Sequence, residues 1–225
     1  MLQHPYPGNA SKFTGVYITG AGMGHRELTI SWYGSYQIDH YGDMGRESDE
    51  THRGSFRLAH NAIQLMRDRS SQPKEYQAVT WGKRHYLIAS ADMIAFCSSV
   101  NDGEFVKNDA FRSEWLLDGN EKFPLTSEAP DVSAQWRGYL LPNALHGKVT
   151  RVINDHTEMV DIGAATGLRC GMNLHIDHTF LCLTVTAIDS HGATVNISDP
   201  DTEDHHAAKG SVRVGAHVSS RLEVN

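Results

Sequence analysis

The strongest constraint on the fold is an alternation of apolar and polar residues that recurs between positions 158 and 188. Val160 and Ile162 begin this pattern, and further runs at 172–176 and 181–186 repeat it. A period of two is typical of a strand with one buried face. Three glycines separate the first two runs, and glycine enters turns at no steric cost. The segment therefore predicts the centre of a small antiparallel barrel or meander.

The same alternation fills most of the first half of the chain. Short apolar–polar runs at 13–18, 28–38, 55–65 and 76–89 are joined by segments containing Gly, Asn or Asp. Short strands at this spacing, connected by such turns, are typical of barrels and meanders. The expected fold class is therefore mainly β: an antiparallel sheet or barrel, followed by a small β-barrel domain.

One segment departs from this pattern. Met93, Ile94, Cys97 and Val100 lie at helical spacing, and an Asn-Asp-Gly sequence follows them. We predict a single helix near residues 91–101. Cys97 would lie on its apolar stripe, where a buried and unreactive thiol is expected.

The chain is long enough for two domains. It has 225 residues, and the stretch from 118 to 131 is rich in charge, Gly and Pro. Such a composition is typical of a domain boundary. We place the first domain, including the helix, at residues 1–125 and the second at 126–225.

Composition and charge restrict the classes of partner and compartment. The formal net charge is −7, which argues against nucleic acid as a partner because counterion release needs clustered Lys and Arg. No apolar run is long enough to predict a membrane span. The three cysteines form no disulfide or C-x-x-C framework. No signal peptide is visible, so a cytoplasmic location is favoured, with the cell envelope as the alternative if a leader has been trimmed.

Residues 13–89 carry a set of short glycine–aromatic and alternating motifs. They are Gly15-x-Tyr17, Leu28-x-Ile30, Gly34-Ser-Tyr36, Gly54-Ser-Phe56-x-Leu58 and Asn61-x-Ile63-x-Leu65. In this series the first half resembles lipocalin-like (calycin-type) barrels. The resemblance implies an antiparallel barrel that binds a ligand.

The second half carries the motif Gly163-x3-Gly167-Leu-x2-Gly171-Met. It resembles the small β-barrel modules appended to bacterial envelope and flagellar-assembly proteins, which implies a role in interaction. As a whole, the chain is similar to uncharacterised bacterial two-part β proteins, a resemblance that implies no activity.

Aromatic residues provide one candidate binding site. Trp32, Tyr36, Trp81 and Tyr86 all fall in or beside predicted strands of the first half. They could line a ligand site, whereas aromatic residues in β proteins also commonly form the core. Alternation would place Trp32 and its neighbour Tyr33 on opposite faces of a strand.

Histidines and carboxylates provide a second candidate site. His175 and Asp177 are two residues apart on a predicted strand, His178 follows, and His205 and His206 lie in a later loop. Neutral imidazoles with a carboxylate suit a divalent metal such as zinc, nickel or iron. The alternative is that these are solvated residues on the polar face of a sheet.

These observations leave several functions open. The first hypothesis is a non-enzymatic binding or interaction protein without a cofactor, whose partner is an unknown small ligand or protein. Such a protein could also form a homo-oligomer through a strand edge. The second is a metal-dependent hydrolase that uses the His/Asp cluster and a metal-bound water. The third is a binding site for a small apolar ligand, enclosed by the aromatic residues of the first half.

Overall fold

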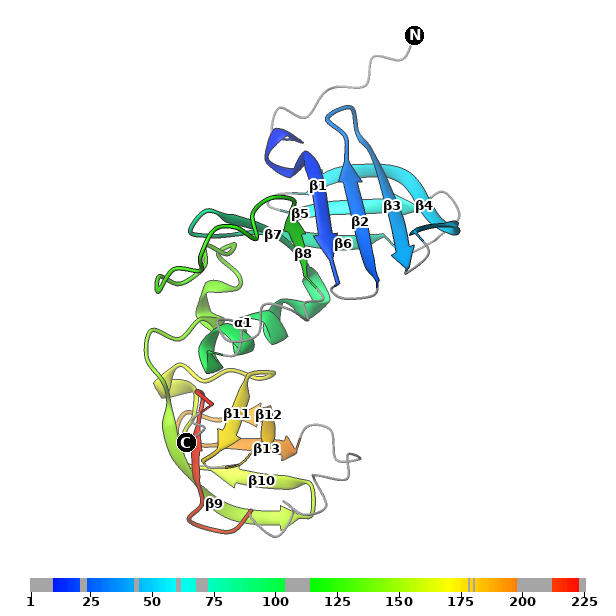
Figure 1. Ribbon diagram of the computed structural model, residues 1–225. Helices are drawn as coiled ribbons and strands as arrows, with labels where there is room; N and C mark the ends of the chain where they lie inside the picture. The colour runs from blue at the N-terminus through cyan, green and yellow to red at the C-terminus, as the bar shows by residue number, and fades with distance from the viewer. Residues whose placement is uncertain are drawn as a thin grey trace. The chain divides into compact units, whose positions relative to one another are not determined.

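The computed structural model describes residues 10–20, 24–42, 45–59, 62–67, 73–103, 114–177, 179, 181–197 and 212–222. Most of these residues lie in strands of two closed antiparallel barrels (Figure 1). One α-helix, α1 (Met93–Asp102), is found within the described part. The predicted fold class, a barrel followed by a small barrel with one helix, is confirmed. No α-helix in the described part of the chain has the length and apolar character of a membrane span.

The chain forms two compact units that are not contiguous in sequence. Of the described residues, the first unit contains those up to 93 and those from 114 to 134. The second contains residues 94–103 and those from 135 onward. From Ile94 onward, α1 therefore belongs to the second unit, whereas the sequence-based division placed it with the first.

The first barrel is an up-and-down meander in which each strand pairs with the next and β8 pairs with β1. The short helix η1 (Ala10–Phe13) precedes it, and η2 (Ser90–Asp92) follows β7. Its strands are β1 (Gly15–Thr19), β2 (His25–Ile30), β3 (Ser35–Gly42), β4 (Gly45–Ala59), β5 (Ala62–Arg67), β6 (Lys74–Trp81), β7 (Arg84–Ala89) and β8 (Trp115–Leu117).

The centre of this barrel is filled by side chains. Strand register places Tyr17 beside Leu28, and Leu28 beside Ile38, on the interior face. An eight-stranded barrel has an interior of about the width that side chains can fill. The buried core consists of Phe13, Tyr17, Leu28, Ile30, Tyr36, Phe56, Ile63, Leu65, Tyr76, Leu87 and Trp115.

The segment from 118 to 132 packs on the outer face of β6 and β7. The buried Arg84 donates from Nε to the carbonyl of Phe123 (2.5 Å) and from Nη2 to that of Glu121 (3.1 Å). The indole of Trp81 donates to the carbonyls of Thr126 and Glu128. Residues 118–131, which the sequence predicted to be a domain boundary, are therefore held on the first barrel. Side chains of the barrel donate hydrogen bonds to the backbone carbonyls of this segment.

The second barrel has the strand order β10-β13-β12-β11-β14-β9, and β9 pairs with β10 to close it. Two short helices, η3 (Arg137–Tyr139) and η4 (Ala164–Thr166), belong to the same unit. Its strands are β9 (His146–Asn154), β10 (Thr157–Val160), β11 (Asn173–Ile176), β12 (Cys182–Ile188), β13 (Ala193–Ile197) and β14 (His217–Ser219).

The alternation read from the sequence accounts for the core of this barrel. Val160, Leu174, Leu183 and Val195 are almost fully buried and share one cluster. Gly167 ends η4 with φ +96°, a left-handed conformation that favours glycine.

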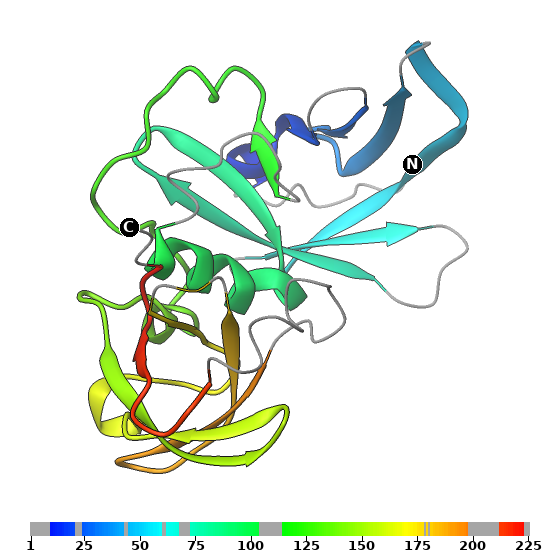
Figure 2. The same ribbon diagram turned by 60° about the horizontal axis from the view of Figure 1, so that its bottom comes forward.

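Helix α1 packs on the outer face of the second barrel (Figure 2). Ser98 Oγ accepts a hydrogen bond from the backbone N–H of Asn173 on β11 (3.3 Å). The Asn101 amide accepts from the N–H of Leu141 and donates to the carbonyl of Tyr139, each at 2.9 Å. Burial raises the pKa of the Cys97 thiol on this helix to about 12, so the thiol stays protonated at neutral pH, as expected from its position on the apolar stripe.

The pairing of β3 with β4 contains a large bulge, in which several extra residues lie on β4. Ile38 pairs with His52, but His40, two residues later, pairs with Glu47, five residues earlier on β4. Asp39 lies between these two pairs. Bulges of this kind bend a strand and redirect its side chains.

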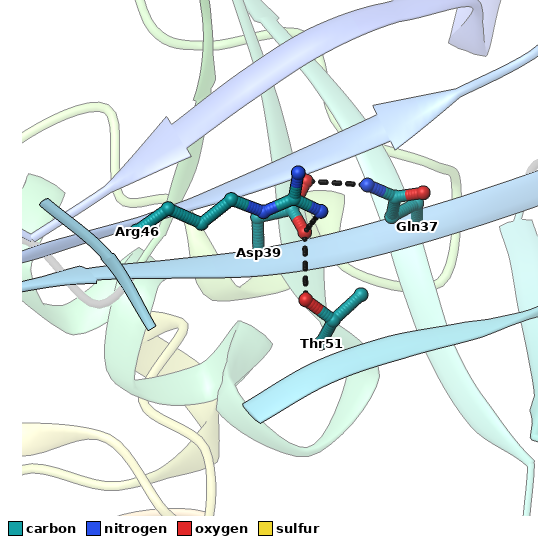
Figure 3. Close-up of polar contacts among 4 residues, drawn as sticks. All are labelled: Gln37, Asp39, Arg46 and Thr51. Carbon is teal, nitrogen blue, oxygen red and sulfur yellow. Dashed lines mark hydrogen bonds and ion pairs between the residues drawn. The ribbon is translucent and has the colours of Figure 1, made fainter. Parts of the chain in front are cut away.

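The carboxylate of Asp39 fixes this bulge (Figure 3). It accepts hydrogen bonds from Gln37 Nε2 (2.6 Å) on its own strand, Arg46 Nη2 (2.5 Å) before the bulge and Thr51 Oγ1 (3.1 Å) after it. Burial alone would raise the pKa of Asp39, but these hydrogen bonds and the positive charge of Arg46 outweigh it and lower the pKa. One buried carboxylate thus joins both sides of the irregularity.

Replacing Asp39 by Asn should lower the free energy of unfolding of the first barrel by about 1–3 kcal/mol near neutral pH, because charge-assisted hydrogen bonds are lost. Since the pKa of Asp39 is lowered by folding, its contribution is present above the unfolded-state pKa and is lost as the pH falls through the folded-state pKa. Urea unfolding of both proteins at several pH values should show the difference shrinking toward acid pH.

The matched control is Asp118→Asn, because Asp118 is an exposed carboxyl of the same unit. Its replacement should change the free energy of unfolding by less than about 0.5 kcal/mol. Equal losses in the two variants would contradict a specific role for Asp39.

A carboxyl group is also buried in the second barrel. Glu158 lies on β10 with the interior residue Val160 two positions later, and it pairs with Val195. It is 1% exposed, and its Oε2 atom has no hydrogen-bond partner in the described part of the chain. Burial raises the pKa of Glu158 to about 7, since desolvation penalises the charged form.

We therefore expect Glu158→Gln to stabilise the second barrel above about pH 7, because the variant needs no deprotonated carboxyl in the interior. The raised pKa means that the folded wild type holds a proton that the unfolded chain releases. Its stability should therefore fall as the pH rises from about 4.3 to about 7, whereas the variant should lack this fall. Hydrogen exchange of the β10 and β13 amides against pH measures the difference.

Asp155→Asn provides the comparison, since Asp155 is exposed in the turn after β9. That variant should keep the pH dependence of the wild type. If the stability of Glu158→Gln falls with pH as that of the wild type does, a group other than Glu158 causes the fall.

Candidate functional site

Strand register places a charged residue at one end of the interior of the first barrel. Arg26 pairs with Thr19 on β1 and with His40 on β3. It lies two positions before Leu28, which is fully buried, so it is on the interior face. Arg26 itself is exposed, as expected at the end of the barrel interior.

The guanidinium group of Arg26 lies over the indole ring of Trp115, 5.5 Å from its centroid. Trp115 is buried on β8, beside the core residue Leu87. A cation over an aromatic face is held by the ring's charge distribution and keeps its N–H groups for other acceptors. Arg26 makes no hydrogen bond or ion pair to any residue within the described part of the chain.

Trp115 is in turn joined to Tyr76 on β6 by a side-chain hydrogen bond. The indole N–H can only donate, so the phenol oxygen accepts and its own proton stays available. Burial raises the pKa of Tyr76. The hydrogen bond from Trp115 and the charge of Arg26 lower this pKa, and the charge of Asp92 raises it further. The phenol is therefore protonated at neutral pH, so its O–H group can donate a hydrogen bond.

Two imidazoles extend this group of residues. The rings of His40 and His52 are 5.9 Å apart and meet edge to face. His52 pairs with Ile38, an interior position, and both histidines are half-buried. They are the residues on either side of the bulge that Asp39 fixes, so this bulge brings them together.

We refer to Arg26, His40, His52, Tyr76 and Trp115 as the Arg26 cluster. The side chains of the cluster carry more hydrogen-bond donors than acceptors. The arginine brings five N–H donors, the phenol one, and each neutral imidazole one donor and one acceptor. The sequence analysis missed this cluster, although Arg26 and His40 occupy the apolar register of their strands, which was a detectable signal.

The aromatic residues predicted to bind a ligand are distributed over three environments. Tyr36 lies in the core of the first barrel. Trp81 and Tyr86 are buried on the outer face of β6 and β7, at register positions opposite to the interior ones. Trp32 is 61% exposed in the turn between β2 and β3. The four side chains therefore do not line one interior surface.

Trp32 does not lie on the opposite face from its neighbour, as alternation suggested. Both Trp32 and Tyr33 (62% exposed) lie in the turn, with ring centroids 5.7 Å apart in an edge-to-face contact. Gly34 closes this turn with φ +94°. The period of two ends with the strand, so it does not apply to these two residues.

Two of the five predicted metal ligands lie in the described part of the chain. His175 is buried on β11, and Asp177 is half-buried in the turn that follows. His178, His205 and His206 lie outside the described residues. Within the described residues, no group of three or more His, Cys, Asp or Glu side chains could hold a metal ion. The metal site stays a prediction.

His175 faces helix α1. Its Nε2 atom is 3.5 Å from Oδ2 of Asp102, the last residue of α1, and both side chains are buried. Among the residues that the structure describes, the Nε2 atom has no hydrogen-bond partner. In the described part of the structure, this pair links the end of the helix to the outer face of the second barrel.

Comparison with known proteins gives no family assignment. No protein-family model matches the chain, and no curated protein sequence is significantly similar to it. Functional inference therefore depends on the geometry of the chain itself.

Asp102→Ala should loosen α1 by about 1–3 kcal/mol, because it leaves a buried imidazole without its neighbouring carboxylate. Hydrogen exchange of the α1 amides is the measurement, and faster exchange is expected. Asp177→Ala is the matched control, since this half-buried carboxyl follows the same strand. If both variants accelerate exchange in α1 equally, the Asp102–His175 contact does not hold the helix.

Proposed function

We propose that the protein is a non-enzymatic binding protein whose first barrel takes a small ligand at the end of its interior, at the Arg26 cluster. The observation that carries this proposal is the guanidinium of Arg26. It lies on the interior face, is fixed against Trp115, and makes no hydrogen bond or ion pair within the described chain. A positioned guanidinium with no acceptor among the described residues suits a ligand better than a role in stabilising the fold.

The architecture supports the same proposal. Ligands of β-barrels bind preferentially at the ends of the barrel interior. The centre of this barrel is occupied by Tyr17, Leu28 and other core residues. A ligand at the Arg26 cluster would therefore be small and bound near the surface. The resemblance of residues 13–89 to lipocalin-like barrels agrees with such a role.

The electrostatics of Tyr76 favour hydrogen bonding over proton transfer by this residue. A general acid or base works best when its pKa is close to the working pH. The pKa of Tyr76 is raised, away from neutrality. A phenol in this state donates a hydrogen bond and keeps its proton.

The test is a screen of small aromatic and aliphatic fragments of mixed charge, followed by amide ¹H–¹⁵N chemical shifts. Binding fragments should shift amides of β1, β2, β3 and β8 around Arg26. Arg26→Gln should remove these shifts, because the variant lacks the guanidinium. Arg57→Gln is the matched control, since Arg57 is an exposed arginine of the same barrel beside the inward-facing Phe56.

The control variant should bind as the wild type does. Fragment shifts confined to the second barrel, or none from the whole screen, would contradict the proposal. Dispersed amide spectra for both variants show that each is folded.

A further inference from the structure

We infer that the group recognised at the Arg26 cluster is an oxyanion, a carboxylate or a phosphoryl group carried by a small organic molecule. This inference rests on the proposed function and adds the chemical class of the ligand. It is drawn from the donors of the cluster, their fixed positions and the charges around them.

The first argument is the shape of the principal donor. A guanidinium presents its N–H groups in a planar fork that matches the two oxygens of a carboxylate or phosphoryl group. In Arg26 the contact with Trp115 is to the ring face, 5.5 Å from its centroid, and uses the charge of the group. The fork is therefore open to a bidentate acceptor.

The second argument is the rigidity of the support. Trp115 is buried, pairs with Leu87 on β7 and is hydrogen-bonded to Tyr76. A side chain stacked on such a ring loses less conformational freedom when it binds a ligand. Arg26 is thus held in place before a ligand arrives.

The third argument is the balance of donors and acceptors. Tyr76 keeps a proton to donate because its own oxygen accepts from Trp115. The rings of His40 and His52, on the neighbouring strands β3 and β4, meet edge to face beside these donors. Oxyanions offer only acceptors, so they suit this set better than ligands that bring donors of their own.

The fourth argument is the distribution of charge. The chain carries a net charge of −7, yet the five members of the cluster include a permanent cation and no carboxylate. Glu47 on β4 pairs with His40. Glu27 follows Arg26 but points to the opposite face of β2, where it lies 3.4 Å from His25. Asp39 is on that same outer face and forms an ion pair with Arg46. Asp92 is the carboxylate whose charge reaches Tyr76.

The size of the ligand follows from the core below. Leu28 and Tyr17 lie one register step further in and are fully or almost fully buried. A long acyl chain would have to displace them, which would cost several kcal/mol of packing. Compact molecules with a single charged group and a small apolar part are therefore expected.

The experiment uses four probes with the whole chain: benzoate, phenyl phosphate, the neutral isostere benzamide, and inorganic phosphate. Dissociation constants come from titrations followed by the amide shifts of residues 26, 40 and 115. Benzoate or phenyl phosphate should bind at least about tenfold more tightly than benzamide, a difference of about 1.4 kcal/mol. The ratio of the dissociation constants of benzoate and phenyl phosphate shows whether the site prefers a carboxylate or a phosphoryl group. Inorganic phosphate shows how much of the affinity comes from the oxyanion alone.

Three variants complete the test. Arg26→Gln should lower the affinity for the anionic probes about tenfold or more and leave the affinity for benzamide unchanged. Arg26→Lys keeps the charge without the fork and should give an intermediate affinity. Arg57→Gln should bind all probes as the wild type does.

Equal binding of benzoate and benzamide at the cluster would overturn the oxyanion inference and leave the proposed binding function standing. Binding of benzoate that persists in Arg26→Gln would overturn it as well. If none of the four probes shifts these amides, the oxyanion inference fails, and the fragment screen alone then decides the binding function.

Discussion

The first barrel depends on the closure supplied by β8, a strand of only three residues. Leu116 and Leu117 pair with β1, and Leu116 and Trp115 pair with β7. Without this strand the facing edges of β1 and β7 would have unpaired backbone N–H and C=O groups, which are costly to bury. The same strand carries Trp115, so the residue that supports Arg26 is also part of the closure.

A second constraint acts across β3 and β4. The Asp39 carboxylate holds Arg46 and Thr51 from opposite sides of the bulge. The consequence reaches the interior, because the strand positions on either side of this bulge are those of His40 and His52. A carboxylate on the outer face thus sets the spacing of two imidazoles on the inner face. Stability and the candidate binding chemistry are linked at this point.

The sequence predicted what depends on local pattern. Alternation between 158 and 188 identified buried residues such as Leu174 and Leu183, and helical spacing identified α1. It could not predict pairings between distant segments. Arg26 occupies an apolar register position that the sequence reveals, but Trp115 is brought beside it only by closure of the barrel. Asp102 and His175 meet for the same reason, across a separation that no periodicity describes.

The path of the chain has a consequence for how this protein can be divided. It leaves the first barrel after β7, contributes α1 to the second unit, and then returns to the first barrel as β8. A cut after residue 125 would therefore separate α1 from the barrel on which it packs. The two barrels are interleaved along the gene product, so recombination could not exchange either of them as one continuous cassette.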